Sequence, residues 1–156
     1  MELHEFSAYE IHRMLLERKV SAVEVATAFL ERIAQVDGRP GTLDTGELTA
    51  DDLAKVHSFI TLTPERALEQ ARRVDERLAA GETPGILAGV PVTGKDIFCV
   101  EGVPATAASR ILANFQAPYT ATPVSRMEAA GGLMLGKVNL DEFTYGSSNE
   151  SSAFQP

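Results

Sequence analysis

The segment from Gly89 to Asp96 carries the residues best suited to chemistry. Its order, Gly-Val-Pro-Val-Thr-Gly-Lys-Asp, follows the phosphate-binding pattern G-x-x-x-x-G-K up to the last position of that pattern. A P-loop has serine or threonine there to hold magnesium, whereas this chain has Asp96, whose charge repels phosphate. Pro91 also lacks one of the backbone N–H groups that would cradle a phosphate. Nucleotide binding by this segment is therefore the weaker interpretation.

Two other uses fit Lys95. It follows an apolar run and precedes another, Ile97 to Val100, which predicts that its ammonium is drawn toward the interior. Burial disfavours the charged form of a lysine, and a neutral lysine can act as a general base that activates a hydroxyl nucleophile. The structural alternative is a lysine paired with Asp96 or with another carboxylate at the end of a strand. The residues alone leave both interpretations open.

The same segment resembles the G-[IV]-P-x-x-x-K-D segment of the amidase-signature family. Three further stretches follow in the order of that family, over residues 101–106, 121–124 and 136–139, with Ala105 where the family commonly has threonine. The resemblance covers about residues 50 to 156. It implies that Lys95 is the base of a Ser–cis-Ser–Lys triad and that the fold is an α/β/α sandwich.

The last part of the chain narrows the resemblance. Residues 139–143, Asn-Leu-Asp-Glu-Phe, and the serine-rich stretch over 146–154 are similar to a segment typical of the A subunits of tRNA-dependent amidotransferases within this family. Stand-alone amidases of the family, which show a looser version here, are the alternative. The resemblance implies that the backbone of Gly146, Ser147 and Ser148 lies near the substrate amide. Asp141 and Glu142 are adjacent and point to different sides, so we expect a structural or capping role for them.

The resemblance also implies a reaction and its partners. A serine attacks the side-chain amide of glutamine, an acyl-enzyme forms, and the ammonia passes to a second subunit that amidates glutamate or aspartate mischarged on tRNA. The implied partners are the B and C subunits of the amidotransferase, with the tRNA held by the B subunit. No cofactor is implied in this chain, because ATP and magnesium are used by the partner subunit. The serines of the family follow beyond Pro156, so we expect these residues alone to be inactive.

Local signals predict the elements that position Lys95. Capping boxes at Ser7–Glu10 and Ser21–Glu24 predict two helices, and Thr63-Pro64 predicts a third that ends at Gly81. Residues 37–52 are rich in turn formers and predict a loop or a short insertion. Further on, apolar runs predict strands over 87–92, 97–100 and 133–135, a helix from Thr122 to the Gly131-Gly132 pair, and a helix opening over 139–143.

These elements predict an α/β protein. We expect the N-terminal part of the amidase-signature α/β/α sandwich with its large mixed sheet, preceded by a helical arm. The arm is predicted over residues 1–80, and the start of the α/β core over 81–156. A purely helical interaction module, the rival from another class, would not need the apolar strands around Val90 and Met134.

Composition excludes several other classes. The 156 residues carry a formal net charge of -8, so an RNA contact is better assigned to a partner than to this acidic chain. The single cysteine, Cys99, excludes an intrachain disulfide and a cysteine-based metal cluster, and His4, His12 and His57 lack metal-ligand spacing. No apolar run approaches the about 20 residues that span a bilayer, and the acidic start is unlike a signal peptide. We expect a cytoplasmic protein with no membrane partner.

Overall fold

The computed structural model describes residues 2–41, 43 and 49–154. The chain is mixed α/β. Its helices are α1 (Ala8–Leu16), α2 (Ala22–Val36), α3 (Ala50–Leu53), α4 (Pro64–Ala79) and α5 (Thr122–Ala129). Its strands are β1 (Phe59–Leu62), β2 (Pro91–Lys95) and β3 (Leu133–Val138), and short 3-10 turns lie at Leu3–Glu5, Arg110–Leu112 and Glu142–Thr144. No helix in these described ranges is long and apolar enough to cross a membrane.

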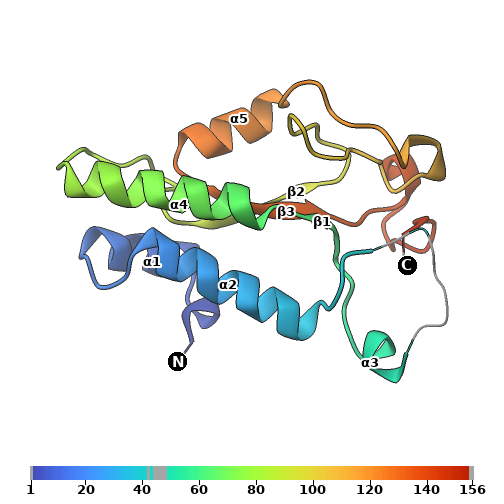
Figure 1. The fold of residues 1–156 in the computed structure, drawn as a ribbon, viewed down its shortest axis with the longest axis horizontal. Coiled ribbons are helices and arrows are strands. Elements are labelled where there is room, and N and C mark those ends of the chain that lie inside the picture. The colour runs from blue at the N-terminus through green and yellow to red at the C-terminus, as the bar shows by residue number, and fades with distance from the viewer. Residues whose placement is uncertain (1, 42, 44–48, 155–156) are drawn as a thin grey trace. The chain divides into compact units, whose positions relative to one another are not determined.

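The strands form a small mixed sheet in the order β1-β3-β2 (Figure 1). β3 pairs antiparallel with β1, with Thr61 opposite Lys137 and Leu62 opposite Gly136. On the other side, the N–H of Leu133 donates to the carbonyl of Val90, and the N–H of Asp96 donates to the carbonyl of Val138. The residue numbers on both sides of these bonds increase in the same direction, so β2 runs parallel to β3. This sheet confirms the α/β prediction and places β2 at an edge, where a proline at the first position is tolerated.

The chain divides into two compact units. Unit 1 comprises Met1–Ile33, Thr63–Val92 and Ser125–Leu135, and unit 2 comprises Ala34–Leu62, Thr93–Val124 and Gly136–Pro156. Both units draw on segments before and after residue 80. The division into an arm over 1–80 and a core over 81–156 stays a prediction.

Unit 1 is a helical layer packed on the start of β3. Its buried core comes from α1, α2, α4, the turn before β2 and β3, namely Leu15, Ala22, Ala26, Ala71, Val74, Ala88 and Leu133. The alanines allow the helices to approach closely, and Figure 1 shows α4 running alongside α2. The carboxylate of Asp75 on α4 accepts hydrogen bonds from the backbone N–H groups of Ala22 and Val23, at 2.7 and 3.1 Å. One helix therefore caps the N-terminus of the other.

The predicted helix starts are confirmed. Ser7 and Glu10 exchange both bonds of a capping box, and so do Ser21 and Glu24. Hydrogen bonds from the capping serine lower the pKa of each glutamate. α4 begins at Pro64 as predicted, but the hydroxyl of Thr63 donates to the carbonyl of Met134 on β3 at 2.8 Å and does not cap the helix.

Three predicted elements are wrong. The strand expected over 87–92 begins only at Pro91, because residues 85–90 form a turn. In this turn Gly89 has a φ of +73° and lies close to the side chain of Leu15. The strand expected over 97–100 is a turn whose apolar side chains, Ile97 and Phe98, are 39% and 38% exposed. The helix expected over 139–143 is reduced to the 3-10 turn at Glu142–Thr144, because Phe143 adopts φ 50°.

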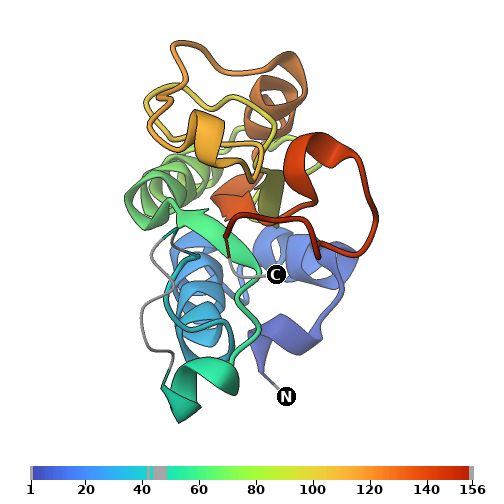
Figure 2. The ribbon, with the colours of Figure 1, turned by 90° about the vertical axis from the view of Figure 1, so that its right-hand side faces the viewer.

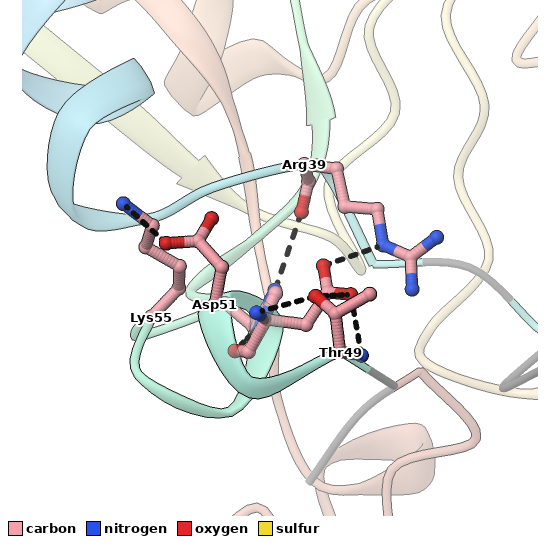
Figure 3. A network of polar contacts seen from close by, with 6 residues as sticks. Arg39, Thr49, Asp51 and Lys55 are labelled. Atoms are coloured by element: carbon pink, nitrogen blue, oxygen red, sulfur yellow. Dashed lines mark hydrogen bonds and ion pairs between the residues drawn. The ribbon is translucent and has the colours of Figure 1, made fainter. Parts of the chain in front are cut away.

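The region predicted as a loop over 37–52 carries its own polar framework in unit 2. Thr49 and Asp52 form a capping box that begins α3, and Asp52 also pairs with Arg39 at 3.1 Å (Figure 3). In Figure 2, α3 leads directly into β1. The buried carboxylate of Asp37 accepts from the N–H groups of Ser58 and Phe59, which fixes the start of that strand. The prediction of a loop was therefore wrong at 50–52, and its residues 42 and 44–48 lie outside the described residues.

Candidate functional site

Lys95 is the last residue of β2, and its side chain is exposed. Side chains alternate along a strand, so Thr93 and Lys95 are exposed while Gly94 and Asp96 are buried. The expectation that the ammonium of Lys95 is drawn into the interior is therefore wrong for this chain. The apolar run after it, which suggested burial, forms a surface turn.

The buried lysine is Lys137, on the central strand β3. Its Nζ lies 2.9 Å from Oδ1 of Asp96, and both side chains are 0% exposed. The same Nζ donates to the carbonyl oxygen of Pro104 at 3.0 Å. The other oxygen of Asp96 accepts from the N–H and the hydroxyl of Thr106, at 2.9 and 2.5 Å. Asp96, the first carboxylate considered as a partner for Lys95, thus pairs with Lys137. Pairing of Lys95 with another carboxylate stays a prediction.

This ion pair is costly to bury and is supported by further hydrogen bonds to both partners. Desolvation of each ion in a protein interior costs several kcal/mol, and the attraction between the ions offsets this cost only when the remaining donors and acceptors are satisfied. Here Pro104 and Thr106 supply those additional bonds. In the sequence, Lys137 stands within the stretch over 136–139 that resembles the family, and no role is predicted for it. A lysine within the apolar run from Leu133 to Val138 was the signal that a buried carboxylate had to lie opposite.

The backbone around Asp96 is fixed from two directions. Its N–H donates to the carbonyl of Val138 at 3.0 Å, and its own carbonyl accepts from the N–H of Ala107 at 3.3 Å. Ala107 and Ala108 both have positive φ, 51° and 55°, which is uncommon for residues other than glycine. The tight bend at these alanines turns the segment over 104–108 around the carboxylate. The end of β2 is therefore held by side-chain and main-chain bonds at once.

Asp141 organises the serine-rich loop over residues 146–152. Its buried carboxylate accepts from the N–H groups of Ser148, Asn149 and Ser151, at 2.9, 3.0 and 3.3 Å, and from the hydroxyl of Ser151 at 2.8 Å. These bonds, the one from the Asn149 N–H first, lower the pKa of Asp141 below its ordinary value. Glu142 accepts from the hydroxyl of Ser109 at 2.5 Å. The predicted structural role of both acidic residues is confirmed.

Gly146 lies against the Asp141 carboxylate. A Cβ at this position would meet the carboxyl carbon at 2.6 Å and both of its oxygens at 2.8 Å. That carboxylate is held in place by the loop, so only glycine allows the close approach. Gly146, Ser147 and Ser148 are exposed, which leaves them accessible to a substrate. Their predicted role in substrate binding is not tested by this geometry and stays a prediction.

Comparison with known proteins decides the family. Residues 49–156, more than half of the chain, match the Amidase family. The chain belongs to the amidase family. Over 149 residues it is 46% identical to the A subunit of glutamyl-tRNA(Gln) amidotransferase from Nostoc punctiforme, a match that covers 96% of this chain and 27% of that protein. The chain thus spans a little over a quarter of the length of this relative.

Solved structures agree with this assignment. An inhibitor-bound member of a vestigial protein complex, described as revealing the origins of an s-triazine catabolic enzyme, matches with a TM-score of 0.82 and 32% identity, over 97% of this chain and 30% of that one. The native peptide amidase from Stenotrophomonas maltophilia matches with a TM-score of 0.71 and 29% identity, over 89% of this chain and 26% of that one. The fold predicted from the resemblance is therefore confirmed as that of the amidase family.

Hydrogen bonds join the end of β2 and the Asp141 loop within unit 2. The N–H of Phe143 donates to the carbonyl of Ala107 at 3.0 Å, and the N–H of Ala153 donates to the carbonyl of Ala108 at 2.9 Å. The segment that wraps Asp96 is therefore also the segment on which the Asp141 loop rests. These main-chain bonds connect the end of β2 to the serine-rich loop.

The structure also tests whether the segment from Gly89 to Asp96 forms a phosphate-binding loop. A P-loop is a glycine-rich loop whose free N–H groups lead into a helix, whereas Pro91–Lys95 is a strand followed by a turn. The P-loop alternative thus loses the loop that it requires. Within the described ranges, no group of three or more His, Cys, Asp or Glu side chains is placed to hold a metal. His12 and His57 instead bond to backbone carbonyls, of Ala88 at 3.0 Å and of Asp52 at 2.7 Å.

Proposed function

We propose that these residues belong to the glutamine-hydrolysing A subunit of a tRNA-dependent amidotransferase. The observation that carries the proposal is the 46% identity to a protein of that kind over 96% of this chain. The reaction is hydrolysis of the glutamine side-chain amide. Its ammonia converts glutamate on tRNA(Gln), or aspartate on tRNA(Asn), to the amide.

In this proposal Lys95 is the general base. The Lys95 amine takes the proton of the cis-serine, and the cis-serine takes the proton of the nucleophilic serine, whose oxygen bonds to the amide carbon. The carbon–nitrogen bond then breaks as the amide nitrogen accepts a proton and leaves as ammonia. Water then releases glutamate from the acyl-enzyme. The exposure of Lys95 at the end of β2 supports this role, because the amine is accessible to a hydroxyl from another segment. The serines themselves are assigned to no residue of this chain.

The Asp141 loop supplies the proposed contacts to the amide. Its geometry narrows which groups are available, because the N–H of Ser148 is already bonded to Asp141. The described residues offer no acceptor for the N–H groups of Gly146 and Ser147. We therefore assign these two N–H groups as the donors that face the substrate amide oxygen, where donors stabilise developing negative charge.

The proposal includes partners and a compartment. The B and C subunits of the amidotransferase are the proposed partners, with ATP, magnesium and the mischarged tRNA bound by the B subunit. The net charge of -8 supports the assignment of RNA binding to a partner, because an acidic surface repels phosphate. The single cysteine, which excludes an intrachain disulfide, supports a reducing cytoplasm as the site of action.

Substitution of Lys95 in the full-length protein, assembled with its partners, tests the proposal. Lys95→Ala should abolish glutamine-dependent amidation, by about 10²–10⁴-fold or more, and leave amidation driven by added ammonium salt nearly intact. Lys95→Arg should fail almost as badly, since a guanidinium stays protonated and cannot serve as a base. Near-normal glutamine-dependent turnover in Lys95→Arg would overturn the role of the base.

A stand-alone amidase is the second candidate function. The likeness to the peptide amidase, with 29% identity and a TM-score of 0.71, supports it, although the identity to the amidotransferase protein is higher. The two functions differ in their dependence on partners. A member of an amidotransferase should hydrolyse glutamine faster when its partners, ATP and mischarged tRNA are present. A stand-alone amidase should hydrolyse small amides at the same rate without them.

A further inference from the structure

We propose that the buried Asp96–Lys137 ion pair is a positioning device for Lys95. This inference rests on the proposed function, because it assigns to the pair the task of fixing the base at the end of β2. The motivating observation is a charged pair with both side chains 0% exposed, one partner of which directly follows Lys95 in the chain. Neither residue of the pair is assigned to the reaction itself.

The bonds of Asp96 leave little freedom at the peptide that joins it to Lys95. Its N–H, its carbonyl and both carboxylate oxygens are all engaged, by Val138, Ala107, Lys137 and Thr106 respectively. The direction in which the side chain of Lys95 leaves the strand is set by this peptide. Because successive side chains point to opposite faces, holding Asp96 inward holds Lys95 outward.

Lys137 connects β3 to two other segments, the end of β2 at Asp96 and the segment over 104–106. It lies on β3, opposite Thr61 of β1, and its ammonium reaches past Asp96 to the carbonyl of Pro104. The pair therefore ties β3 to the segment over 104–106 with the end of β2 between them. An apolar pair of similar volume could fill this space and is often as stabilising as a buried ion pair. The ion pair adds a directional hydrogen bond from Lys137 to Asp96, which fixes one arrangement of β3 relative to the end of β2.

Kinetics of the full-length protein with its partners tests this positioning. Lys137→Met keeps the length of the side chain and removes the ammonium. We expect kcat for glutamine-dependent amidation to fall by about 10–100-fold, since a misplacement of about 1 Å at a catalytic group costs up to 10²-fold. KM for glutamine should stay within about twofold and ammonium-driven amidation should be unchanged, because Lys95 acts only on amide cleavage.

Lys55→Met is the matched control. Lys55 also pairs with an aspartate in unit 2, Asp51 at 3.7 Å, and donates to the carbonyl of Gln35, but it has no bond to β2 or to the segment over 104–108. We expect its kinetics to equal those of the unsubstituted protein. An equal loss of kcat in both variants would overturn the assignment.

A double-mutant cycle separates positioning from general support of the fold. If Lys137 acts through Lys95, Lys137→Met should cause no further loss of glutamine-dependent turnover in a Lys95→Ala background. If the pair merely stabilises the fold, the loss should be the same in both backgrounds, and ammonium-driven amidation should fall with it. The second outcome would overturn the proposal.

Hydrogen exchange gives a readout that does not depend on activity. In the same protein, Lys137→Met should speed exchange at the amides of Asp96 and Thr106 by at least about tenfold, because both are bonded through this cluster. The amide of Val25 in unit 1, bonded to the carbonyl of Ser21 just before α2, should be unaffected. Unchanged exchange at Asp96 would overturn the proposal. If Lys137→Met fails to fold, Asp96→Asn, which keeps the size of the side chain, replaces it in each measurement.

Absence of glutaminase activity in the unsubstituted protein would refute the proposed function, but it would not show whether the Asp96–Lys137 pair holds the end of β2. The exchange measurement would then still decide whether Lys137 holds the end of β2. Faster exchange at Asp96 together with normal kcat in Lys137→Met would show that the ion pair holds the end of β2 without affecting catalysis. That outcome would overturn the proposed positioning of Lys95. The two failures are therefore distinguishable.

Discussion

Gly136 lies on the central strand β3 where β1 comes close, and its replacement by alanine is the sharpest test of the sheet. A Cβ at this position would lie 2.4 Å from the carbonyl oxygen of Thr61, 3.0 Å from the ring of Phe59 and 3.1 Å from Cα of Leu62. Two of these contacts are backbone atoms of β1, which cannot rotate away as a flexible side chain can. The β1 backbone must therefore withdraw from β3 by about 0.6 Å or more.

The cost of this withdrawal follows from what holds β1 in place. Overpacking of a tight site costs about 1–3 kcal/mol. The pairing of Thr61 with Lys137 and of Leu62 with Gly136 weakens as well, at about 1 kcal/mol for each hydrogen bond lost. We expect Gly136→Ala to lower the free energy of unfolding by about 2–5 kcal/mol. That is a large fraction of the about 5–15 kcal/mol that stabilises a typical domain.

Urea unfolding followed by circular dichroism measures the change. Gly102→Ala is the control, because its Cβ would meet nothing within 4 Å and only the positive φ of +74° is strained. The control should lose about 1 kcal/mol. Equal stability of Gly136→Ala and the unsubstituted protein would refute the close approach of β1 to β3 at this glycine.

Two further predictions concern single carboxylates. Asp75→Ala should lower the free energy of unfolding by about 0.5–2 kcal/mol, since the N–H groups of Ala22 and Val23 lose their acceptor while the Ser21–Glu24 capping box remains. Exposed Arg73→Ala on the same helix should change it little. Urea unfolding measures both variants, and equal losses would contradict the capping role of Asp75. The pKa of Asp141 is lowered, so its contribution to loop stability is complete above the ordinary value of 3.8 and is lost only as the pH falls through the lower folded pKa. The amide proton resonance of Asn149 should report this titration with a midpoint below 3.8, and a midpoint at or above 3.8 would contradict it.

The starts of the helices could be predicted because their signals are local. Ser7 and Glu10 are three residues apart and satisfy each other, and Pro64 favours the first turn of α4 whatever surrounds it. The start of β2 could not be predicted in this way. The turn before it depends on Gly89 lying against Leu15 and on Gly131 lying against Ala88, contacts between segments far apart in the sequence.

The prediction that Lys95 is buried was wrong for the same reason, because contacts between distant segments decide where β2 begins. Apolar neighbours in sequence suggested that Lys95 is buried, but the alternation of β2 decides which face a residue occupies, and a strand whose start is misplaced gives no reliable face. The position of Lys137 within an apolar strand predicted burial more directly, yet its partner Asp96 lies 41 positions away. Pairing at that separation is set by the fold.

The Asp141 loop lies between these cases. Adjacency of Asp141 and Glu142 was enough to predict a structural role, because neighbours cannot aim at one substrate. The partners themselves, Ser148, Asn149 and Ser151, became visible only when the loop was seen to fold back on the carboxylate. The roles of Lys95 and of Gly146 to Ser148 in the reaction came from family resemblance and remain proposals.

The neighbouring positions of Lys95 and Asp96 restrict how the gene for this protein can change. A substitution alters one side chain, but gain of a single codon in β2 before Lys95 would move Lys95 into the buried position of Asp96 and Asp96 into the exposed position after it. The ammonium of Lys95 would then face the buried ammonium of Lys137, and the carboxylate of Asp96 would be left at the surface. We expect natural variants of this strand to differ by replacement and not by length, even at positions whose side chains contact nothing.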